Sequence, residues 1–281
     1  AIETHSLAWH LLLFLALSII NLSLDAKAWQ LIESMVNRIS LGKALSHNLK
    51  CYGLAFITPL NSGELAGRYL VQKNPVHRKK ALFLTFWTHA PKLFSKALVS
   101  LLILSYLAFE KTGDPSLGIS GLFLFALVFF IYTQLQRIIA LAHNKQLWNR
   151  PLKDYLLRDL PKTSLKLKAL TLNALRFLIF SGQLVVILDL INPELINPDL
   201  VLSIPLFYFL TAVIPTFAGL DFLIKGVLAM YFFGAFNDQA LIFGLATTAV
   251  WLFNLAIPSL IGLASLSKAE LNILKQRTKR S

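Results

Sequence analysis

Two acid–base pairs carry the clearest chemical signal in this sequence. Glu64 and Arg68 stand four residues apart, as do Asp221 and Lys225, and both pairs lie among apolar residues. Each pair follows a proline and a glycine that are also four residues apart, namely Pro59 and Gly63 in the first stretch and Pro215 and Gly219 in the second. Proline interrupts a helix, so the spacing predicts a broken helix at each site. Paired broken helices in opposite halves of a hydrophobic chain are typical of transporters.

Two roles are open for these pairs. Residues four apart share one face of a helix, so each pair could neutralise itself and be purely structural. Alternatively, the two restarted helices point their free N–H groups at an anion, with Asn61 and Thr216 as N-caps and the bases supplying countercharge. Because the arrangement occurs twice, we favour a site for an anion or a lipid headgroup.

Other polar residues also interrupt the apolar segments. Arg176 and Gln183 lie about two turns apart near one face of a predicted span, and arginine suits bidentate phosphate binding. The alternative is an arginine that snorkels to the membrane surface. Lys92 and Lys96 could line a phosphate path, although snorkelling is favoured for both. Asn254 is expected to form an interhelical hydrogen bond.

Known catalytic motifs are missing from the sequence. The six histidines do not have the spacing of metal ligands, and neither a G-x-S-x-G turn nor a P-loop occurs. Cys51 is the single cysteine, which excludes an intramolecular disulfide. Each acid of the two pairs has its own cation, which favours a permanently charged carboxylate. We therefore predict no catalytic residue, no metal site and no cofactor.

Composition places the chain in the membrane class. It has 281 residues, of which 56% are hydrophobic and only 15% are charged, whereas soluble domains have about a quarter charged residues. The net charge of +13 would suggest nucleic acid in a soluble protein, but the basic residues gather in loops between apolar runs. This distribution is typical of loops retained on the cytoplasmic side. We therefore expect no nucleic-acid partner.

The apolar segments predict an all-α integral membrane protein that forms one domain over residues 1–281. We expect a multi-pass helical bundle of about seven segments, at 7–24, 44–60, 81–109, 117–142, 169–190, 201–236 and 241–266. Segments 44–60 and 201–236 are the Pro/Gly-broken or re-entrant ones, and 81–109 is expected to be kinked. An amphipathic helix at 28–41 is expected to lie in the interface. An inverted internal repeat would relate 7–142 to 169–266 across a basic, amphipathic cytoplasmic connection at 143–168.

The same residues resemble the transmembrane region of lysylphosphatidylglycerol synthase, a flippase-like domain shared by many small bacterial membrane proteins. The motifs that carry the resemblance are Thr58-Pro59 with Gly63-Glu64 and Arg68, Pro215 with Gly219 and Asp221, Arg176 in the preceding span, and Asn254, Pro258 and Gly262 near the end. In the second motif Leu220 intervenes before the acid. The similarity covers nearly the whole chain.

The resemblance implies a helical bundle that moves or accommodates phospholipid-like headgroups between leaflets of the bacterial inner membrane. The alternation of basic loops with acid-bearing turns separately predicts a cytoplasmic C-terminus. In the fused synthases a separate soluble domain aminoacylates the lipid. Because only a short basic tail follows Leu266, we do not expect aminoacyl transfer.

We therefore predict a lipid flippase or lipid transporter that binds an anionic phospholipid or lipid-linked headgroup in a polar cavity between the two broken helices. The expected headgroup-binding residues are Asn61, Glu64, Arg68, Arg176, Gln183, Thr216, Asp221 and Lys225. The alternative is a membrane-embedded enzyme or transferase subunit that acts on a lipid-linked sugar or phosphate. A scaffold without a polar cavity is a third hypothesis. The expected partners are membrane lipids, with a homodimer or a partner enzyme of a lipid pathway also open.

Overall fold

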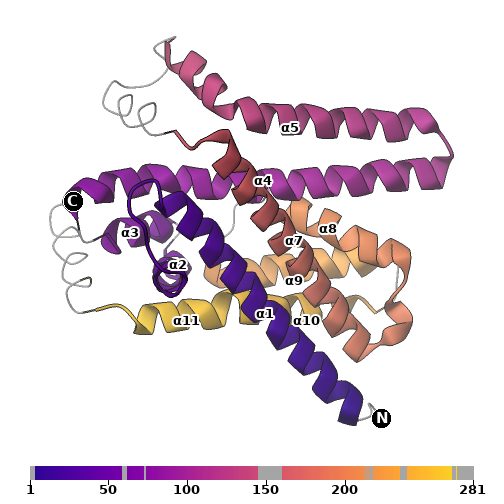
Figure 1. The fold of residues 1–281 in the computed structure, drawn as a ribbon. Coiled ribbons are helices and arrows are strands. Elements are labelled where there is room, and N and C mark those ends of the chain that lie inside the picture. The colour runs from indigo at the N-terminus through magenta and orange to yellow at the C-terminus, as the bar shows by residue number, and fades with distance from the viewer. Residues whose placement is uncertain are drawn as a thin grey trace.

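The computed structural model describes residues 4–58, 62–72, 74–144, 160–212, 214, 218–234, 239–267 and 270 (Figure 1). Within these ranges every regular element is a helix. Five helical stretches are long and apolar enough to cross a membrane: α1 (Thr4–Glu33), α4 (Pro75–Thr112), α5 (Pro115–Asn144), α7 (Thr163–Ile191), and α10 (Ala240–Trp251) continued by α11 (Ile257–Ala264). The π-helical turn η4 (Leu252–Ala256) joins α10 to α11. This is the architecture of a multi-pass helical membrane protein.

Two pairs of shorter helices lie where the sequence predicts broken segments. The first pair is α2 (Leu41–Phe56) with α3 (Ser62–Leu70). The second is α8 (Pro198–Ala212) with α9 (Asp221–Gly234), preceded by the short turns η2 (Pro193–Leu195) and η3 (Ala218–Leu220). We call these pairs the first and the second hairpin. None of the four helices reaches 18 residues, so neither hairpin contains a full membrane span.

Glycines set the close packing of the first hairpin. A Cβ atom on Gly63 would lie 2.1 Å from the carbonyl oxygen of Leu54, and one on Gly67 would lie 2.8 Å from Cα of Cys51. Residues 63 and 67 therefore face residues 54 and 51, so α3 runs antiparallel to α2. A side chain at either glycine would push the two backbones apart.

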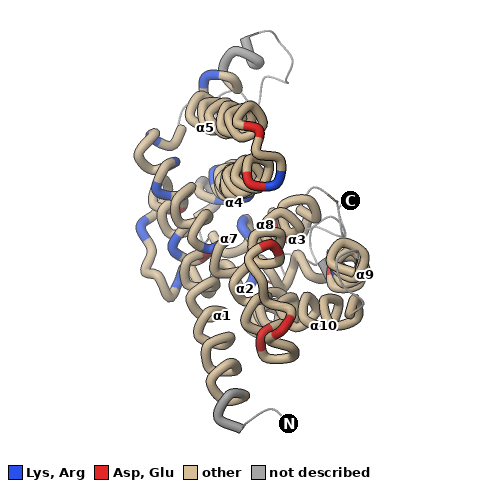
Figure 2. The backbone as a smooth tube through the Cα atoms, turned by 90° about the vertical axis from the view of Figure 1, so that its right-hand side faces the viewer, with Lys and Arg blue, Asp and Glu red and all other residues tan. Residues whose placement is uncertain are grey.

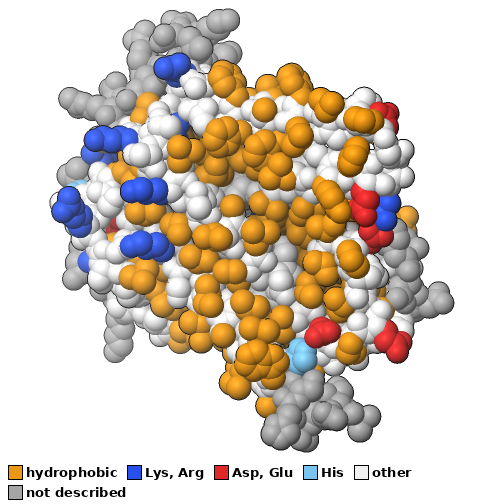
Figure 3. Space-filling view, turned by 45° about the vertical axis from the view of Figure 1, so that its right-hand side comes forward, with side chains coloured by type: hydrophobic (Ala, Val, Ile, Leu, Met, Phe, Trp, Pro, Cys, Tyr) orange, Lys and Arg blue, Asp and Glu red, His pale blue; other side chains and the backbone are white. Residues whose placement is uncertain are grey.

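Charge divides the bundle into a basic and an acidic end. The loops and helix ends on the left of Figure 3 carry exposed lysines and arginines, the right-hand side carries the acids, and a broad apolar belt lies between them. The basic end includes Arg38, Lys43, Lys162 and Lys168, and the acidic end includes Glu110, Asp114, Glu194 and Asp199. Figure 2 views the molecule from the acidic end and shows acids at the near ends of α4 and α5. An apolar belt between polar ends is what a bilayer requires.

The two hairpins lie at opposite ends of this belt. The first begins after the basic loop that follows α1, and α2 packs against α3, α1 and α11. The second begins after the acidic turn that follows α7, and α8 packs against α4 and α7. The hairpins therefore extend from opposite ends toward the middle of the bundle. This arrangement is the one that an inverted repeat produces, but the repeat and the count of seven segments stay predictions.

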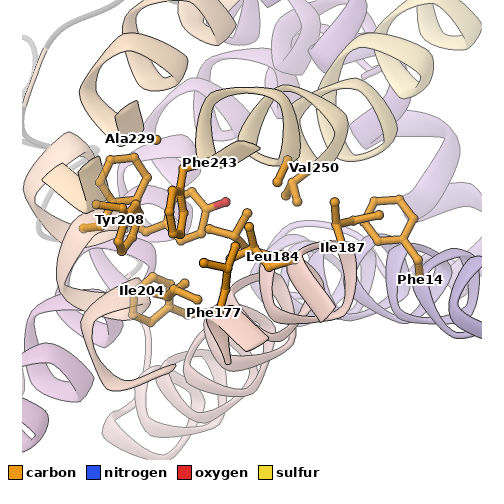
Figure 4. Close-up of a cluster of buried hydrophobic side chains, with 14 residues drawn as sticks. Phe14, Phe177, Leu184, Ile187, Ile204, Tyr208, Ala229, Phe243 and Val250 are labelled. Carbon is orange, nitrogen blue, oxygen red and sulfur yellow. The ribbon is translucent and has the colours of Figure 1, made fainter. Parts of the chain in front are cut away.

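A large apolar cluster attaches the second hairpin to the bundle. Figure 4 shows side chains of α1, α7, α8, α9 and α10 meeting in it. Phe207 of α8 contacts Phe233 of α9 with ring centroids 5.1 Å apart, and Phe233 stacks on Phe243 of α10 at 4.9 Å. Burial of such rings fixes α8 and α9 against the long helices.

One local expectation differs from the structure. Residues 28–33 belong to the end of α1, and Trp29 and Ile32 are buried in a cluster with Leu84 and Trp87. The predicted separate interfacial helix at 28–41 is therefore wrong, because its apolar face packs against other helices. In the predicted segment at 81–109, α4 continues through Pro91, and the expected kink stays a prediction. Most of the connection predicted at 143–168 lies outside the described residues.

Candidate functional site

A cavity of about 820 Å³ lies between α4, α7 and the two hairpins. Its charged and titratable lining residues are Tyr52, Glu64, His89, Lys92, Lys96, Arg176, Asp221 and Lys225. Four of these are basic side chains, namely Lys92 and Lys96 of α4, Arg176 of α7 and Lys225 of α9. Cationic groups inside a membrane-spanning helix bundle are costly unless they are paired or face water. In membrane proteins such groups mark ion or substrate paths.

Asp25 of α1 organises the cations on one side of the cavity. Only 2% of Asp25 is exposed, and its Oδ1 lies 2.8 Å from Nη1 of Arg176 and 3.1 Å from Nζ of Lys92. Asn48 Nδ2 donates to Oδ2 at 2.7 Å, and the Tyr52 hydroxyl also donates to this oxygen. One buried carboxylate thus joins α1 to three other helices, through hydrogen bonds from Asn48 and Tyr52 and ion pairs with Arg176 and Lys92.

The first predicted pair is divided between the cavity and the protein interior. Oε1 of Glu64 lies 3.2 Å from Nη2 of Arg68, and Oε2 lies 3.2 Å from Nε2 of His89. Glu64 lines the cavity, but Arg68 does not. Its guanidinium is 1% exposed, stacks 3.8 Å from the Trp29 ring centre and donates to Asn48. Arg68 therefore supports Glu64 from behind.

The second predicted pair lies in the cavity wall. Lys225 Nζ is 2.7 Å from Oδ2 of Asp221, and both residues line the cavity with Thr211 at the end of α8. The structure thus brings Glu64, Arg176, Asp221 and Lys225 to one cavity. The predicted N-caps Asn61 and Thr216 lie outside the described residues.

Gln183 lies in a polar chain behind the cavity. Its Nε2 donates to Ser18 Oγ at 2.6 Å, and its Oε1 accepts from Asn254 Nδ2 at 3.0 Å. Asn21 Nδ2 donates to Oδ1 of Asn254 at 2.5 Å, while Oδ1 of Asn21 accepts from Nε of Arg176 at 3.1 Å. The predicted interhelical bonding of Asn254 is confirmed. This residue lies in the π-helical turn η4, a distortion that often occurs at functional sites.

Lys92 and Lys96, for which snorkelling was favoured over a phosphate path, both line the cavity. Lys96 Nζ lies 5.9 Å from the ring centre of Phe177. Among the residues that the structure describes, no carboxylate oxygen lies within 4.0 Å of this ammonium.

Trp251 connects the tips of the two hairpins. Its ring centre lies 6.1 Å from that of Phe56 at the end of α2, and 4.7 Å from that of Phe222 at the start of α9. The two hairpin tips therefore contact one residue of the last membrane helix. Motion of either tip would alter packing at Trp251.

Sequence reasoning did not identify Tyr52 and His89, which line the cavity, or Asp25, which pairs with two of its lining residues. The predicted first span ended at Leu24, which placed Asp25 at its edge, although α1 continues through it. A signal was present, because Asn21 and Asp25 stand four residues apart in an otherwise apolar helix. His89 and Tyr52 carried no comparable pattern, since only the packing of α4 and α2 brings them to Glu64 and Asp25.

Within the described parts of the chain, no group of three or more His, Cys, Asp and Glu residues could hold a metal ion. The side chains can instead bind an anion through ammonium and guanidinium groups, and Glu64 can accept a hydrogen bond from a ligand. No protein-family model matches the chain, and the search of curated proteins gave no match.

Proposed function

We propose that this protein is a lipid transporter or flippase of the bacterial inner membrane that takes an anionic lipid headgroup into the cavity. The cavity itself is the observation that carries the proposal. It combines four basic side chains with the tips of two hairpins from opposite ends of the belt. Broken helices that meet near the membrane midplane form the substrate sites of many transporters.

The cavity wall favours a lipid over a small soluble ion. Phe86, Leu93 and Ile214 line the cavity and are 44%, 49% and 42% exposed. Phe86 and Leu93 belong to the candidate membrane span Lys80–Thr112. A headgroup could therefore lie among the lysines while its acyl chains remain in the hydrocarbon.

Orientation follows from the charge at the two ends. In this proposal the basic end faces the cytoplasm, because short loops rich in lysine and arginine stay on that side. The C-terminal end of α11 then lies on the cytoplasmic side as well, near the Lys50–Glu270 ion pair at 2.8 Å. The resemblance to the lysylphosphatidylglycerol synthase transmembrane region supports the same function class. The polar cavity argues against a scaffold, which requires none.

A lipid-scrambling assay tests the proposal. Purified protein in liposomes is expected to move fluorescent anionic lipids between leaflets, measured by the fraction that an external quencher reaches. The double variant D221N/K225Q removes the Asp221–Lys225 ion pair without leaving an unpaired charge, and we expect at least a tenfold slower rate. Lys168→Gln is the matched control, since Lys168 is exposed on α7 outside the cavity.

Unchanged transport in folded D221N/K225Q protein would contradict the proposal. Turnover of a lipid-linked phosphate or sugar by the purified protein would instead support the membrane enzyme.

A further inference from the structure

The ion pairs around the cavity leave a surplus of positive charge. Glu64 pairs with Arg68, and Asp221 pairs with Lys225. Asp25 alone faces two permanent cations, Arg176 and Lys92. Lys96 adds a further cation that has no carboxylate within 4.0 Å in the described ranges. Among the described residues, five basic side chains therefore face three carboxylates, which leaves a surplus of two positive formal charges around the cavity.

These charges act on one region of the cavity. Lys92, Arg176 and Lys225 line the same cavity as Lys96. Arg176 comes from α7 and Lys225 from α9, while Lys92 lies about one turn before Lys96 on α4. In a low-dielectric setting, such a cluster is stable only when an anion or water occupies the space between its members.

The two cations Arg176 and Lys96 differ in how many N–H donors they can offer to a ligand. Arg176 directs Nη1 to Asp25, Nε to Asn21 and Nη2 to Tyr52, which lies 3.5 Å away. Its hydrogen bonds therefore go largely to protein, and its contribution toward the cavity is its charge. The Lys96 ammonium carries three N–H donors and lies near the Phe177 ring, and no carboxylate in the described part of the chain lies within 4.0 Å of it. Lys96 is thus the residue best placed to donate directly to a ligand.

We propose that the cavity selects lipids whose headgroup is a phosphate monoester, and that Lys96 reads its second negative charge. This inference rests on the proposed function and narrows its substrate class. A phosphate monoester carries a charge of about −1.5 to −2 near pH 7, whereas a phosphodiester carries one negative charge. A dianion balances the two surplus cations, and a diester leaves one of them without a partner.

Soluble phosphate monoesters share this chemistry, so the lipid part needs its own support. The exposed apolar lining residues Phe86, Leu93 and Ile214 give the cavity an apolar margin, and Phe86 and Leu93 lie in a candidate membrane span. A soluble phosphate ester has no group to cover that margin. Acyl chains do, which is why we assign the site to a lipid.

The test compares ligands that differ by one charge or by their acyl chains. Purified full-length protein is titrated calorimetrically with dioctanoyl phosphatidic acid, with dioctanoyl phosphatidylmethanol and with sn-glycerol 3-phosphate. Phosphatidylmethanol is the methyl diester of the same phosphate and has one negative charge less. We expect the wild-type protein to bind phosphatidic acid at least tenfold more tightly than either other ligand.

Variants then assign the preference to Lys96. In Lys96→Gln the tenfold preference for phosphatidic acid over phosphatidylmethanol should fall to within twofold. Lys96→Arg keeps the charge and should keep the preference, as should the control Lys168→Gln. Elution volume and melting temperature verify that each variant is folded. If Lys96→Gln does not fold, the wild-type comparison of the two lipids still decides the proposal.

Three results would overturn the proposed preference for a phosphate monoester. They differ in whether they also contradict the proposed transport function. Equal binding of the two lipids, weakened in D221N/K225Q, would reject the monoester and leave the proposed transport of anionic lipids intact. Binding of sn-glycerol 3-phosphate as tight as that of phosphatidic acid would show a site for soluble phosphates. Binding of neither lipid to folded wild-type protein would reject both the inference and the proposed function.

Discussion

Nη1 of Arg176 lies 2.8 Å from Oδ1 of Asp25 and thereby joins α7 to α1 beside the cavity. The two residues are far apart in the sequence, and the carboxylate is almost fully buried. Lys92 of α4 reaches the same oxygen at 3.1 Å. The central helices thus share one anionic group, on which the positions of two cavity cations depend.

Asp25→Asn should destabilise the protein strongly. Asparagine keeps hydrogen-bonding capacity but leaves Arg176 and Lys92 without a countercharge, and loss of one partner of a buried ion pair costs about 3–5 kcal/mol. Thermal unfolding in detergent measures the effect. Adding Lys92→Met to Asp25→Asn should recover part of the loss, because one stranded cation is removed. Equal melting temperatures for wild type and Asp25→Asn would show that the carboxylate does not hold these helices.

Arg68→Lys should also act on folding and not on headgroup contact. Lysine cannot reproduce the planar stack on Trp29 together with the hydrogen bonds to Asn48 and Glu64. We expect a lower melting temperature and a smaller monodisperse fraction in size-exclusion chromatography. Folded Arg68→Lys protein should retain its lipid preference, since Arg68 does not line the cavity. A normal melting temperature with lost lipid binding would contradict this assignment.

The glycines of the first hairpin provide a test of its packing. Gly67→Ala places a Cβ 2.8 Å from Cα of Cys51 and should cost about 1–3 kcal/mol through overpacking. Gly63→Ala, with a backbone oxygen at 2.1 Å, should be worse. Gly42→Ala is the matched control on α2, because nothing lies within 4 Å of its added Cβ. Melting temperatures that fall equally in all three variants would argue against the antiparallel hairpin.

The ion pair between Lys50 and Glu270 predicts a pH effect at the basic end. Burial raises the pKa of Glu270, but hydrogen bonds from Lys50 and Ser267 outweigh it and hold this pKa below its ordinary value of 4.5. A depressed pKa means that the pair stabilises the fold above pH 4.5, and that this stabilisation is lost as the pH falls through the lower folded-state pKa.

Comparing Glu270→Gln with wild type across this range measures the effect. The variant should melt at a lower temperature than wild type at pH 7, and the difference should disappear in acid. Glu110→Gln, at an exposed position of the opposite end, should show no such pH-dependent difference. A difference in melting temperature between wild type and Glu270→Gln that grows as the pH falls would contradict a stabilising role of the Lys50–Glu270 ion pair.

The sequence predicted the parts of the fold that depend on local pattern. The long apolar runs became α1, α4, α5, α7 and α10–α11, and the Pro/Gly stretches mark the two hairpins. The four-residue spacing predicted the Glu64–Arg68 and Asp221–Lys225 pairs, which the structure confirms. Helical periodicity fixes such neighbours without tertiary information.

Contacts between distant helices could not be predicted in this way. Nothing in the spacing of Asp25 and Arg176 indicates that they meet, and the depth of Arg68 depends on the Trp29 ring above it. The sequence favoured snorkelling to the membrane surface for both Lys92 and Lys96. Their direction is set by the packing of α4 against α7 and α8, which a single sequence does not reveal.

The central claim is that a lipid headgroup occupies the cavity between the hairpins. An electron cryo-microscopy map of the protein in nanodiscs containing phosphatidic acid tests it most directly. We expect phosphate density within hydrogen-bonding distance of Lys96 and beside Lys225. The acyl chains should leave the cavity past Phe86 and Leu93. A cavity filled by acyl chains, with headgroups only at the basic and acidic ends of the bundle, would contradict it.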